Sequence, residues 1–211
     1  MYINNKYMGK INFIHIPKNA GTSIKEICNR NREKLIYNGH NTDVHDKNIK
    51  NQLVIIRNPI DRFVSAVNYS LQKWAKASHV KCLIEKQIDT PEKWVQLWMN
   101  PEDDNYPYLM NMIKNDSHKI GTNLLEYKWT YAQQYFWINN PKFVLIMDNL
   151  NEEIQYLTKK YNMKCVIKNK NSTKKINHEL SETSINFLRE FYKEDFILYE
   201  KYQNMSIEER T

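Results

Sequence analysis

Residues 13–27 read FIHIPKNAGTSIKEI, an apolar run followed by a short polar loop and then a helical pattern. The run through Ile16 is typical of a buried strand, and Pro17 ends it because proline cannot continue the hydrogen-bond ladder. A helix that begins near Thr22 directs its free N–H groups back at the loop, and such groups bind anions. With the positive charge of Lys18 at its edge, this turn predicts a phosphate-type site between a strand and a helix.

The loop differs from a Walker A loop, GxxxxGK[ST]. In that motif the lysine follows the glycine, and the Ser or Thr hydroxyl that comes next binds magnesium. Here Lys18 precedes Gly21, and we expect this glycine to permit a tight turn and a close approach of the backbone to a ligand. The loop therefore fits a phosphate group other than that of a magnesium nucleoside triphosphate. The plainer alternative is that Thr22 or Ser23 only caps the helix while Lys18 is solvated.

Apolar runs rich in Ile and Val recur along the chain, and helical patterns follow most of them. Strands that alternate with helices predict an α/β fold with a central parallel sheet flanked by helices. The 211 residues have the length of one domain, so we expect a single domain over residues 1–211. The middle, roughly 78–138, holds four of the five tryptophans and is expected to be a mostly helical insertion over the sheet. The expected strands cover residues 11–16, 52–57, 143–147 and 163–167, and the expected helices cover 22–31, 60–77, 151–161 and 181–203.

The composition narrows the class of protein. The 31 Lys and Arg residues against 24 Asp and Glu give a net charge of +7, which favours polyanionic partners such as nucleic acid, a nucleotide or an acidic glycan. Cys28, Cys82 and Cys165 lie far apart, which argues against a disulfide framework or a zinc site. The opening MYINNKYMGK lacks the apolar core of a signal peptide, and no apolar stretch approaches the roughly 18 residues that span a bilayer. We therefore expect a cytoplasmic protein without a membrane span, and the alternative is the soluble catalytic domain of an anchored protein.

Residues 54–69, VIIRNPIDRFVSAVNY, repeat the arrangement of a strand, a polar turn and a helix. Arg57 falls at the carboxyl end of the strand, where open α/β sheets bind their ligands. Ser65 lies about two helical turns further on, so an arginine fork and a hydroxyl are available for a second phosphate. Asp61 and Arg62 are better explained as an acid in the first helical turn and a salt-bridge partner.

Both motifs resemble those of a known family. HIPKNAGTS resembles the 5′-phosphosulfate loop of the carbohydrate sulfotransferases of the heparan and chondroitin type, and RNPIDRFVSA resembles their 3′-phosphate motif. Asn19 stands where the family usually has Thr, and Ile60 stands where an aromatic residue is common. The resemblance implies a P-loop-like sulfotransferase fold and the donor 3′-phosphoadenosine 5′-phosphosulfate (PAPS), which carries anions at both ends of a nucleoside.

The resemblance also implies roles for individual residues. Lys18 would contact the bridging oxygen of the phosphosulfate and stabilise charge on the departing phosphate. Arg57 and Ser65 would hold the 3′-phosphate. The 5′-phosphate would lie on the backbone amides of the loop and the first helical turn, with two hydroxyls added, and these residues are Asn19, Ala20, Gly21, Thr22 and Ser23.

Transfer to a hydroxyl needs a base, and histidine is suited to that task near neutral pH. His40, in YNGHNTDVHDKN, lies between the two motifs. Relatives that sulfate heparan-type sugars carry a similar Gly-His with that His as base, so His40 is our candidate and His45 the second. His15 lies within the first strand, where a supporting role is expected. The alternative is that His40 is a loop histidine without a catalytic part.

Two further regions are expected to contact substrates. The resemblance places a nucleotide-closing loop after the last strand, where Asn171, Ser172, Lys174 and Lys175 are candidates, with an ordinary surface loop as the alternative. The insertion would form the acceptor site, with tryptophan rings for sugar faces and lysines for an acidic glycan. A buried core and solvated lysines explain the same residues more plainly, and these lysines are Lys73, Lys76, Lys81 and Lys86.

The sequence thus predicts a sulfotransferase that moves a sulfuryl group from PAPS to a hydroxyl, most readily that of a carbohydrate, without a metal. Stabilisation of charge by Lys18 and the loop amides is expected to be the main catalytic effect. Three alternatives remain. A small-metabolite kinase would need ATP and magnesium, a basic nucleic-acid-binding protein would show a continuous basic face, and a nucleotide-binding protein could lack catalysis.

Overall fold

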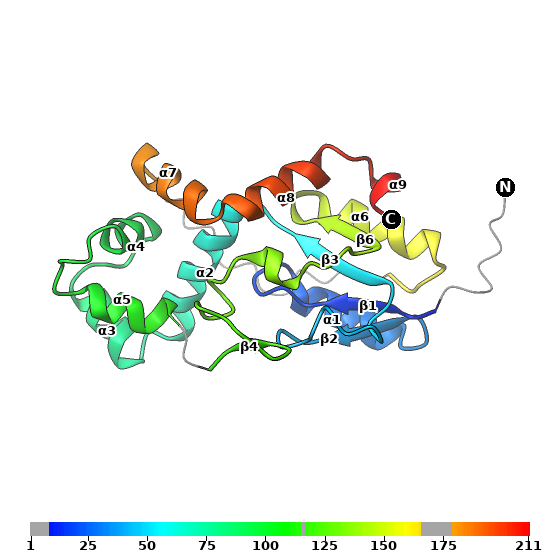
Figure 1. Cartoon of the computed structure of the whole chain (residues 1–211), viewed down its shortest axis with the longest axis horizontal. Coiled ribbons are helices and arrows are strands. Elements are labelled where there is room, and N and C mark those ends of the chain that lie inside the picture. Colours follow the sequence, from blue (N-terminus) through cyan, green and yellow to red (C-terminus); the bar gives the residue numbers. More distant parts are fainter. Residues whose placement is uncertain (1–8, 115–116, 166–178) are drawn as a thin grey trace.

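A computed structural model describes residues 9–114, 117–165 and 179–211. Its centre is a four-stranded parallel sheet in the order β2-β1-β3-β6, which confirms the expected α/β fold (Figure 1). In three of the strands every residue is buried, because helices or loops cover both faces of the sheet. These are β1 (Ile11–Ile14), β3 (Gln52–Ile56) and β6 (Phe143–Ile146), and the sequence predicted all three.

The fourth strand was not predicted. It is β2 (Leu35–Asn38), an edge strand that pairs with β1 and in which Leu35 alone is buried, so it lacks the apolar run of the others. The run at 163–167 was expected to be a strand. That expectation is wrong over 163–165, which the structure places outside any strand, and 166–167 lie outside the described residues.

Helices α1 (Gly21–Arg30) and α6 (Leu150–Lys160) cover one face of the sheet, and their apolar residues share a core with alternate residues of β1, β3 and β6. The other face packs against η2 (Gln134–Trp137) and α8 (Lys193–Gln203). The helix expected over 181–203 is two helices, α7 (Glu182–Phe191) and α8. The chain bends at Tyr192, which is buried and donates a hydrogen bond to the Tyr131 carbonyl at 2.8 Å.

The helices of the insertion lie beside the sheet rather than over it. Figure 1 shows α3 (Ser78–Glu85), α4 (Pro91–Trp98) and α5 (Tyr106–Ile113) beyond one end of the sheet, where α2 (Pro59–Lys73) reaches them. They form a core of their own with α2 and α7. The chain then returns through the hairpin of β4 (Lys119–Ile120) and β5 (Asn123–Leu124) to the second face of the sheet.

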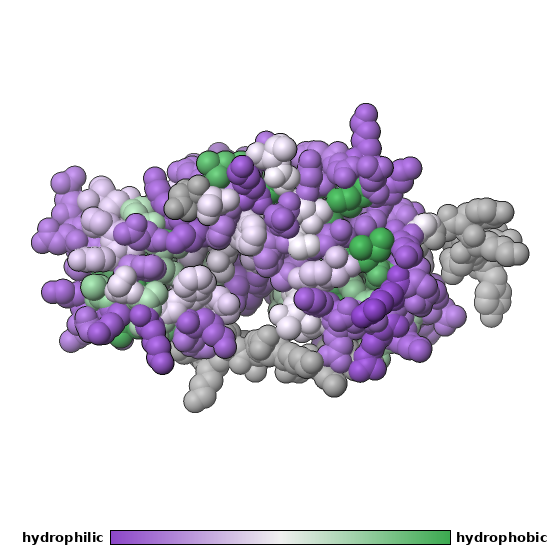
Figure 2. Space-filling model, turned by 90° about the horizontal axis from the view of Figure 1, so that it is seen from below, coloured by the Kyte–Doolittle hydropathy of each residue, from purple (hydrophilic) through white to green (hydrophobic). Residues whose placement is uncertain are grey.

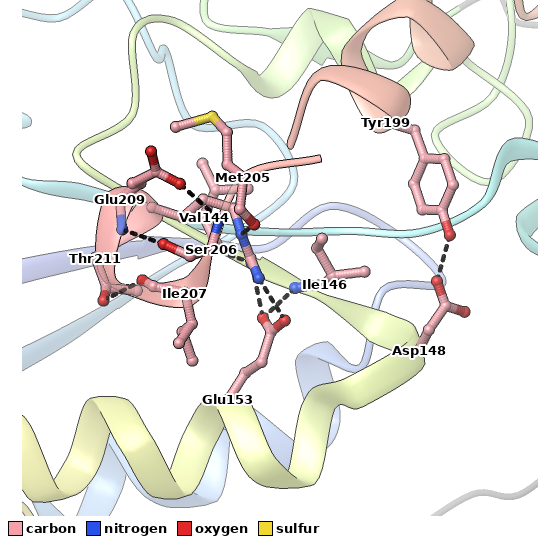
Figure 3. Close-up of polar contacts among 11 residues, drawn as sticks. Val144, Ile146, Asp148, Glu153, Tyr199, Met205, Ser206, Ile207, Glu209 and Thr211 are labelled. Carbon is pink, nitrogen blue, oxygen red and sulfur yellow. Dashed lines mark hydrogen bonds and ion pairs between the residues drawn. The ribbon is translucent and has the colours of Figure 1, made fainter. Parts of the chain in front are cut away.

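Side chains close the outer edge of β6 in place of another strand (Figure 3). Glu153 accepts a hydrogen bond from the Ile146 amide, and Arg210 donates to the Val144 carbonyl at 3.0 Å. Arg210 and Glu153 also form a buried ion pair at 2.9 Å. These contacts fix α9 (Ile207–Arg210), the last helix, to the sheet.

The surface seen in Figure 2 is mostly hydrophilic, and its apolar residues form small separate groups. This distribution is ordinary for a surface in contact with water. Within the described parts of the chain, no helix is both long and apolar enough to cross a membrane.

Candidate functional site

The turn from β1 into α1 presents unpaired backbone amides. Lys18 and Ala20 adopt left-handed backbone angles, with φ of 68° and 54°, and Ala20 caps α1 without a side-chain hydrogen bond. Among the described residues, the amides of Lys18, Ala20, Gly21 and Thr22 donate to no acceptor. Alternating left-handed residues and a helix N-terminus turn such amides toward one point, which is the arrangement of an anion site.

Gly21 is required for a reason that the sequence did not indicate. Its φ is not left-handed, so the tight turn comes from Lys18 and Ala20 instead. A Cβ on Gly21 would overlap the His15 imidazole. The glycine therefore makes room for His15 under the turn.

Lys18 is half-buried, and its Nζ lies 4.1 Å from the centre of the Tyr69 ring. Burial lowers the pKa of Lys18 to about 8, and the positive charges of Arg57 and Arg62 add to the effect. The carboxylates of Asp61 and Asp148 act on Arg57, and that of Asp195 acts on Arg62. Among the described residues, however, no acid contributes to the shift in the pKa of Lys18. An anionic ligand beside Lys18 would offset the repulsion from the two arginines.

The turn from β3 into α2 is built differently. The side chain of Asn58 caps α2 by accepting hydrogen bonds from the amides of Ile60 and Asp61, at 3.0 and 3.3 Å. The cation at this turn is Arg57, whose Nη1 donates to the Lys18 carbonyl at 3.2 Å. One N–H of the fork thus joins the two turns, and within the described parts of the chain the others donate to no acceptor and can serve a ligand.

Ser65 and Arg62 both lie on α2 but in different environments. Ser65 is half-buried and lies four residues before Tyr69, so it shares the helix face that meets Lys18. Arg62 was expected to be a salt-bridge partner, but it is fully buried and donates to three carbonyls instead. These are the carbonyls of Pro17 at 3.0 Å, Ala132 at 2.7 Å and Trp129 at 3.1 Å.

His40 lies against the first turn. Its Nδ1 is 2.9 Å from the His15 carbonyl, which can only accept, so Nδ1 carries the proton and neutral Nε2 carries the lone pair. The His40 ring lies 4.0 Å from the His15 ring and 5.2 Å from that of Trp129, measured between centres. Burial lowers the pKa of His40, the hydrogen bond to His15 opposes this, and the charges of Arg62 and His118 lower it further. His40 is therefore a neutral base at pH 7.

Comparison with known proteins identifies the family. A family model described as a sulfotransferase family matches residues 1–203. The chain belongs to the sulfotransferase family. No curated protein and no solved structure matches the chain. The parallel sheet flanked by helices is consistent with the fold of a sulfotransferase, a class of transferase enzymes that move sulfuryl groups.

The other histidines near the site have different environments. In this sulfotransferase His45 is exposed, and its backbone amide donates to Asp43 Oδ1 at 3.0 Å. His15 contacts the Tyr37 hydroxyl through Nδ1. Burial, followed by the charges of His40 and Lys25, lowers the pKa of His15 to about 3, so it stays neutral and supports the first turn.

One segment meets both turns through contacts that the sequence did not indicate, although Trp129 was among the aromatic residues expected at the acceptor site. Residues 129–135 return from the insertion and meet both turns, with Trp129 against His40 and Gln134 against Asn19 and Arg57. No local pattern marks them, because their contacts arise only when the chain folds back. The predicted nucleotide-closing residues Asn171, Ser172, Lys174 and Lys175 lie outside the described residues.

The aromatic and basic residues expected at the acceptor site fall into two groups. Trp94, Trp98 and Trp137 are buried in cores, whereas Trp74 is 50% exposed and Trp129 is half-buried. The four predicted lysines are all exposed, and Lys81 forms a surface ion pair with Glu85 at 3.6 Å.

Proposed function

We propose that this sulfotransferase takes its sulfuryl group from PAPS and passes it to a hydroxyl of a carbohydrate. The observation that carries the donor assignment is the hydrogen bond from Arg57 Nη1 to the Lys18 carbonyl, 3.2 Å long, which joins two cationic turns at the ends of neighbouring strands. A donor with anions at both ends of a nucleoside needs two such sites side by side.

The residues present suit this donor. The unpaired amides of the first turn, with the hydroxyls of Thr22 and Ser23, would hold the 5′-phosphosulfate. The free N–H groups of Arg57 and the hydroxyl of Ser65 would hold the 3′-phosphate. Lys18 would lie against the 5′ end, where its lowered pKa would rise as the anion removes the repulsion.

His40 and Lys18 would share the transfer step. As the acceptor oxygen bonds to sulfur, His40 Nε2 would take the acceptor's proton. The bond between sulfur and the bridging oxygen breaks, and its electron pair stays on the 5′-phosphate. The Lys18 ammonium group would stabilise that developing negative charge, as would the amides of Ala20, Gly21 and Thr22. The amides of Asn19 and Ser23, which were also expected in this set from the sequence, donate to backbone carbonyls instead.

A carbohydrate acceptor is supported by charge and by one aromatic ring. The net charge of +7 and the exposed lysines of the insertion would attract an acidic glycan. Trp129, beside the proposed base, is a half-buried aromatic ring that is stacked on His118, and aromatic rings of this kind pack on the apolar faces of sugars.

Calorimetric titration tests the donor directly. The purified protein is titrated with 3′-phosphoadenosine 5′-phosphate, the product of the donor, and in parallel with ATP and magnesium. We expect tight binding of the bisphosphate and no binding of ATP, after which a screen of glycans with PAPS identifies the acceptor. Binding of magnesium ATP alone would favour a kinase, and failure to bind the bisphosphate would overturn the donor assignment.

A further inference from the structure

Gln134 contacts both anion turns, although it is distant from each of them in sequence. It is the first residue of η2, and its side chain is fully buried. Its Oε1 accepts from Asn19 Nδ2 at 3.0 Å, in the first turn, and from the Arg57 amide at 3.2 Å, in the second. Its Nε2 donates to the Arg57 carbonyl at 2.8 Å.

These bonds use both ends of a carboxamide. Glutamine offers an acceptor and a donor, whereas an apolar residue offers neither and a carboxylate offers acceptors only. In a buried setting each unmade bond leaves a desolvated polar group on the turns, so the chemistry of this side chain matters. Asn19 is also fully buried, and its Nδ2 donates to the Ile55 carbonyl at 2.7 Å, which binds the first turn to β3.

The segment that carries Gln134 is itself fixed by two buried charges. Asp195 on α8 accepts from the amides of Gln134 and Tyr135, at 2.8 and 2.9 Å. Arg62 donates to the carbonyls of Trp129 and Ala132 in the same segment. Asp195 and Arg62 thus hold the backbone of this segment in place, while the Gln134 side chain bonds to the two turns.

We propose that Gln134 is a positioning residue that sets the two anion turns at the spacing of a two-ended donor. The inference rests on the proposed donor and goes beyond it, since Gln134 itself touches no substrate. A ligand with one phosphate uses one turn and is insensitive to the distance between them. A ligand with two phosphates needs both turns in register, so it depends on the residues that join them, and Gln134 does so beside the bond from Arg57 to the Lys18 carbonyl.

Titration of the whole protein with three ligands separates positioning from a local defect. The ligands are 3′-phosphoadenosine 5′-phosphate, adenosine 5′-monophosphate and adenosine 3′-monophosphate. Gln134→Met keeps the length of the side chain and removes every hydrogen bond. We expect it to lose at least tenfold in affinity for the bisphosphate and less than twofold for either monophosphate.

Two further variants complete the test. Gln133→Leu is the matched control, because the side chain of the adjacent Gln133 donates to the Phe191 carbonyl at 3.4 Å and, among the described residues, to neither turn. Its affinities should match those of the wild type. Gln134→Glu keeps the acceptor oxygen and loses the donor, so its bisphosphate affinity should fall between the other two. If Gln134→Met fails to fold, Gln134→Glu against wild type decides the question by the same comparison.

The outcomes distinguish this inference from the donor assignment. A bisphosphate loss equal to the product of the two monophosphate losses would mean that Gln134 only shapes each turn locally, and positioning would be refuted. Unchanged bisphosphate affinity would refute it as well. A wild-type protein that does not bind the bisphosphate would overturn the donor assignment, and the inference with it.

Discussion

The turn after β1 and the turn after β3 each carry a polar loop into a helix, but the two helices begin in different ways. α1 begins after Ala20, which provides no side-chain cap, and the first amides stay unpaired. α2 begins after Asn58, whose side chain accepts from two amides, and the cation Arg57 stands beside them. Similar sequence patterns therefore leave different groups free for an anion.

The difference assigns different tasks to the two turns. Backbone amides at an uncapped helix end are fixed in place. They lie in the same turn as Lys18, and His40 is hydrogen-bonded to the His15 carbonyl just before that turn. Fixed dipoles aimed at developing charge are suited to catalysis. The guanidinium of Arg57, a planar fork of donors at a capped helix end, is suited to holding a phosphate that does not react. We expect the first turn to govern turnover and the second to govern affinity.

The largest effect is expected at His40, which is hydrogen-bonded to the first turn through the His15 carbonyl. His40→Ala removes the proposed base, and we expect kcat to fall on the order of 10²- to 10⁴-fold. Sulfate transfer from PAPS measures the loss, with His45→Ala as the control because His45 is exposed. Equal losses of kcat in the two variants, or no loss in His40→Ala, would show that His40 is not the base.

Lys18→Ala should have the next largest effect. The ammonium group would stabilise the departing phosphate, so its removal is expected to lower kcat on the order of 10²- to 10³-fold. Calorimetry with the bisphosphate should show a smaller loss, since the amides of the turn remain. Lys159→Ala, which changes an exposed lysine at the end of α6, is the control. A loss confined to affinity would show that the first turn binds without catalysing.

Arg57→Ala should have the opposite effect to Lys18→Ala, with a large loss of affinity and little loss of kcat. Hydrogen bonds to charged groups contribute about 1.5–3 kcal/mol, so bisphosphate affinity is expected to fall about 10- to 100-fold. The affinity for adenosine 5′-monophosphate and kcat at saturating donor should change little. Arg57→Lys, which keeps the charge and loses the fork, should fall between the two. If kcat falls as steeply as it does in Lys18→Ala, the two turns do not divide their tasks.

How far the sequence predicted these features depended on whether they are local. β1, β3 and β6 are apolar runs with every residue buried, and both turns follow directly from them. β2 escaped prediction because an edge strand with one buried residue carries no such run.

The contacts between distant segments could not be predicted. Gln134 and Trp129 reach the site only because the chain folds back from the insertion. Gly21 was expected at the turn, but its reason, the His15 ring beneath it, depends on how β1 packs. Arg62 has the same sequence context as a surface salt-bridge residue and is instead buried against three carbonyls.

The next largest effect is expected in the pH dependence of bisphosphate affinity, which should come from Lys18 in the first turn and not from the second turn. An anion favours charged Lys18, whose pKa in the free protein is lowered to about 8, so above that pH binding must take up a proton. Bisphosphate affinity is therefore expected to fall between pH 7 and 9, by up to about tenfold per pH unit above 8. Calorimetry in two buffers of different ionisation enthalpy measures the proton uptake. Lys18→Met should abolish both the fall and the uptake, and a fall that persists in this variant would place the titrating group elsewhere.

The smallest effect is expected at the cap of α2. Asn58→Ala leaves the amides of Ile60 and Asp61 without their acceptor and should lower the free energy of unfolding by about 1 kcal/mol, measured by urea denaturation. Bisphosphate affinity should stay near the wild-type value, because these amides are not used for binding. Thr90→Ala, which removes the cap of α4 in the insertion, should cost a similar amount and is the control. If Asn58→Ala instead binds the bisphosphate more tightly, its freed amides have joined the site, and the cap is what keeps the second turn from resembling the first.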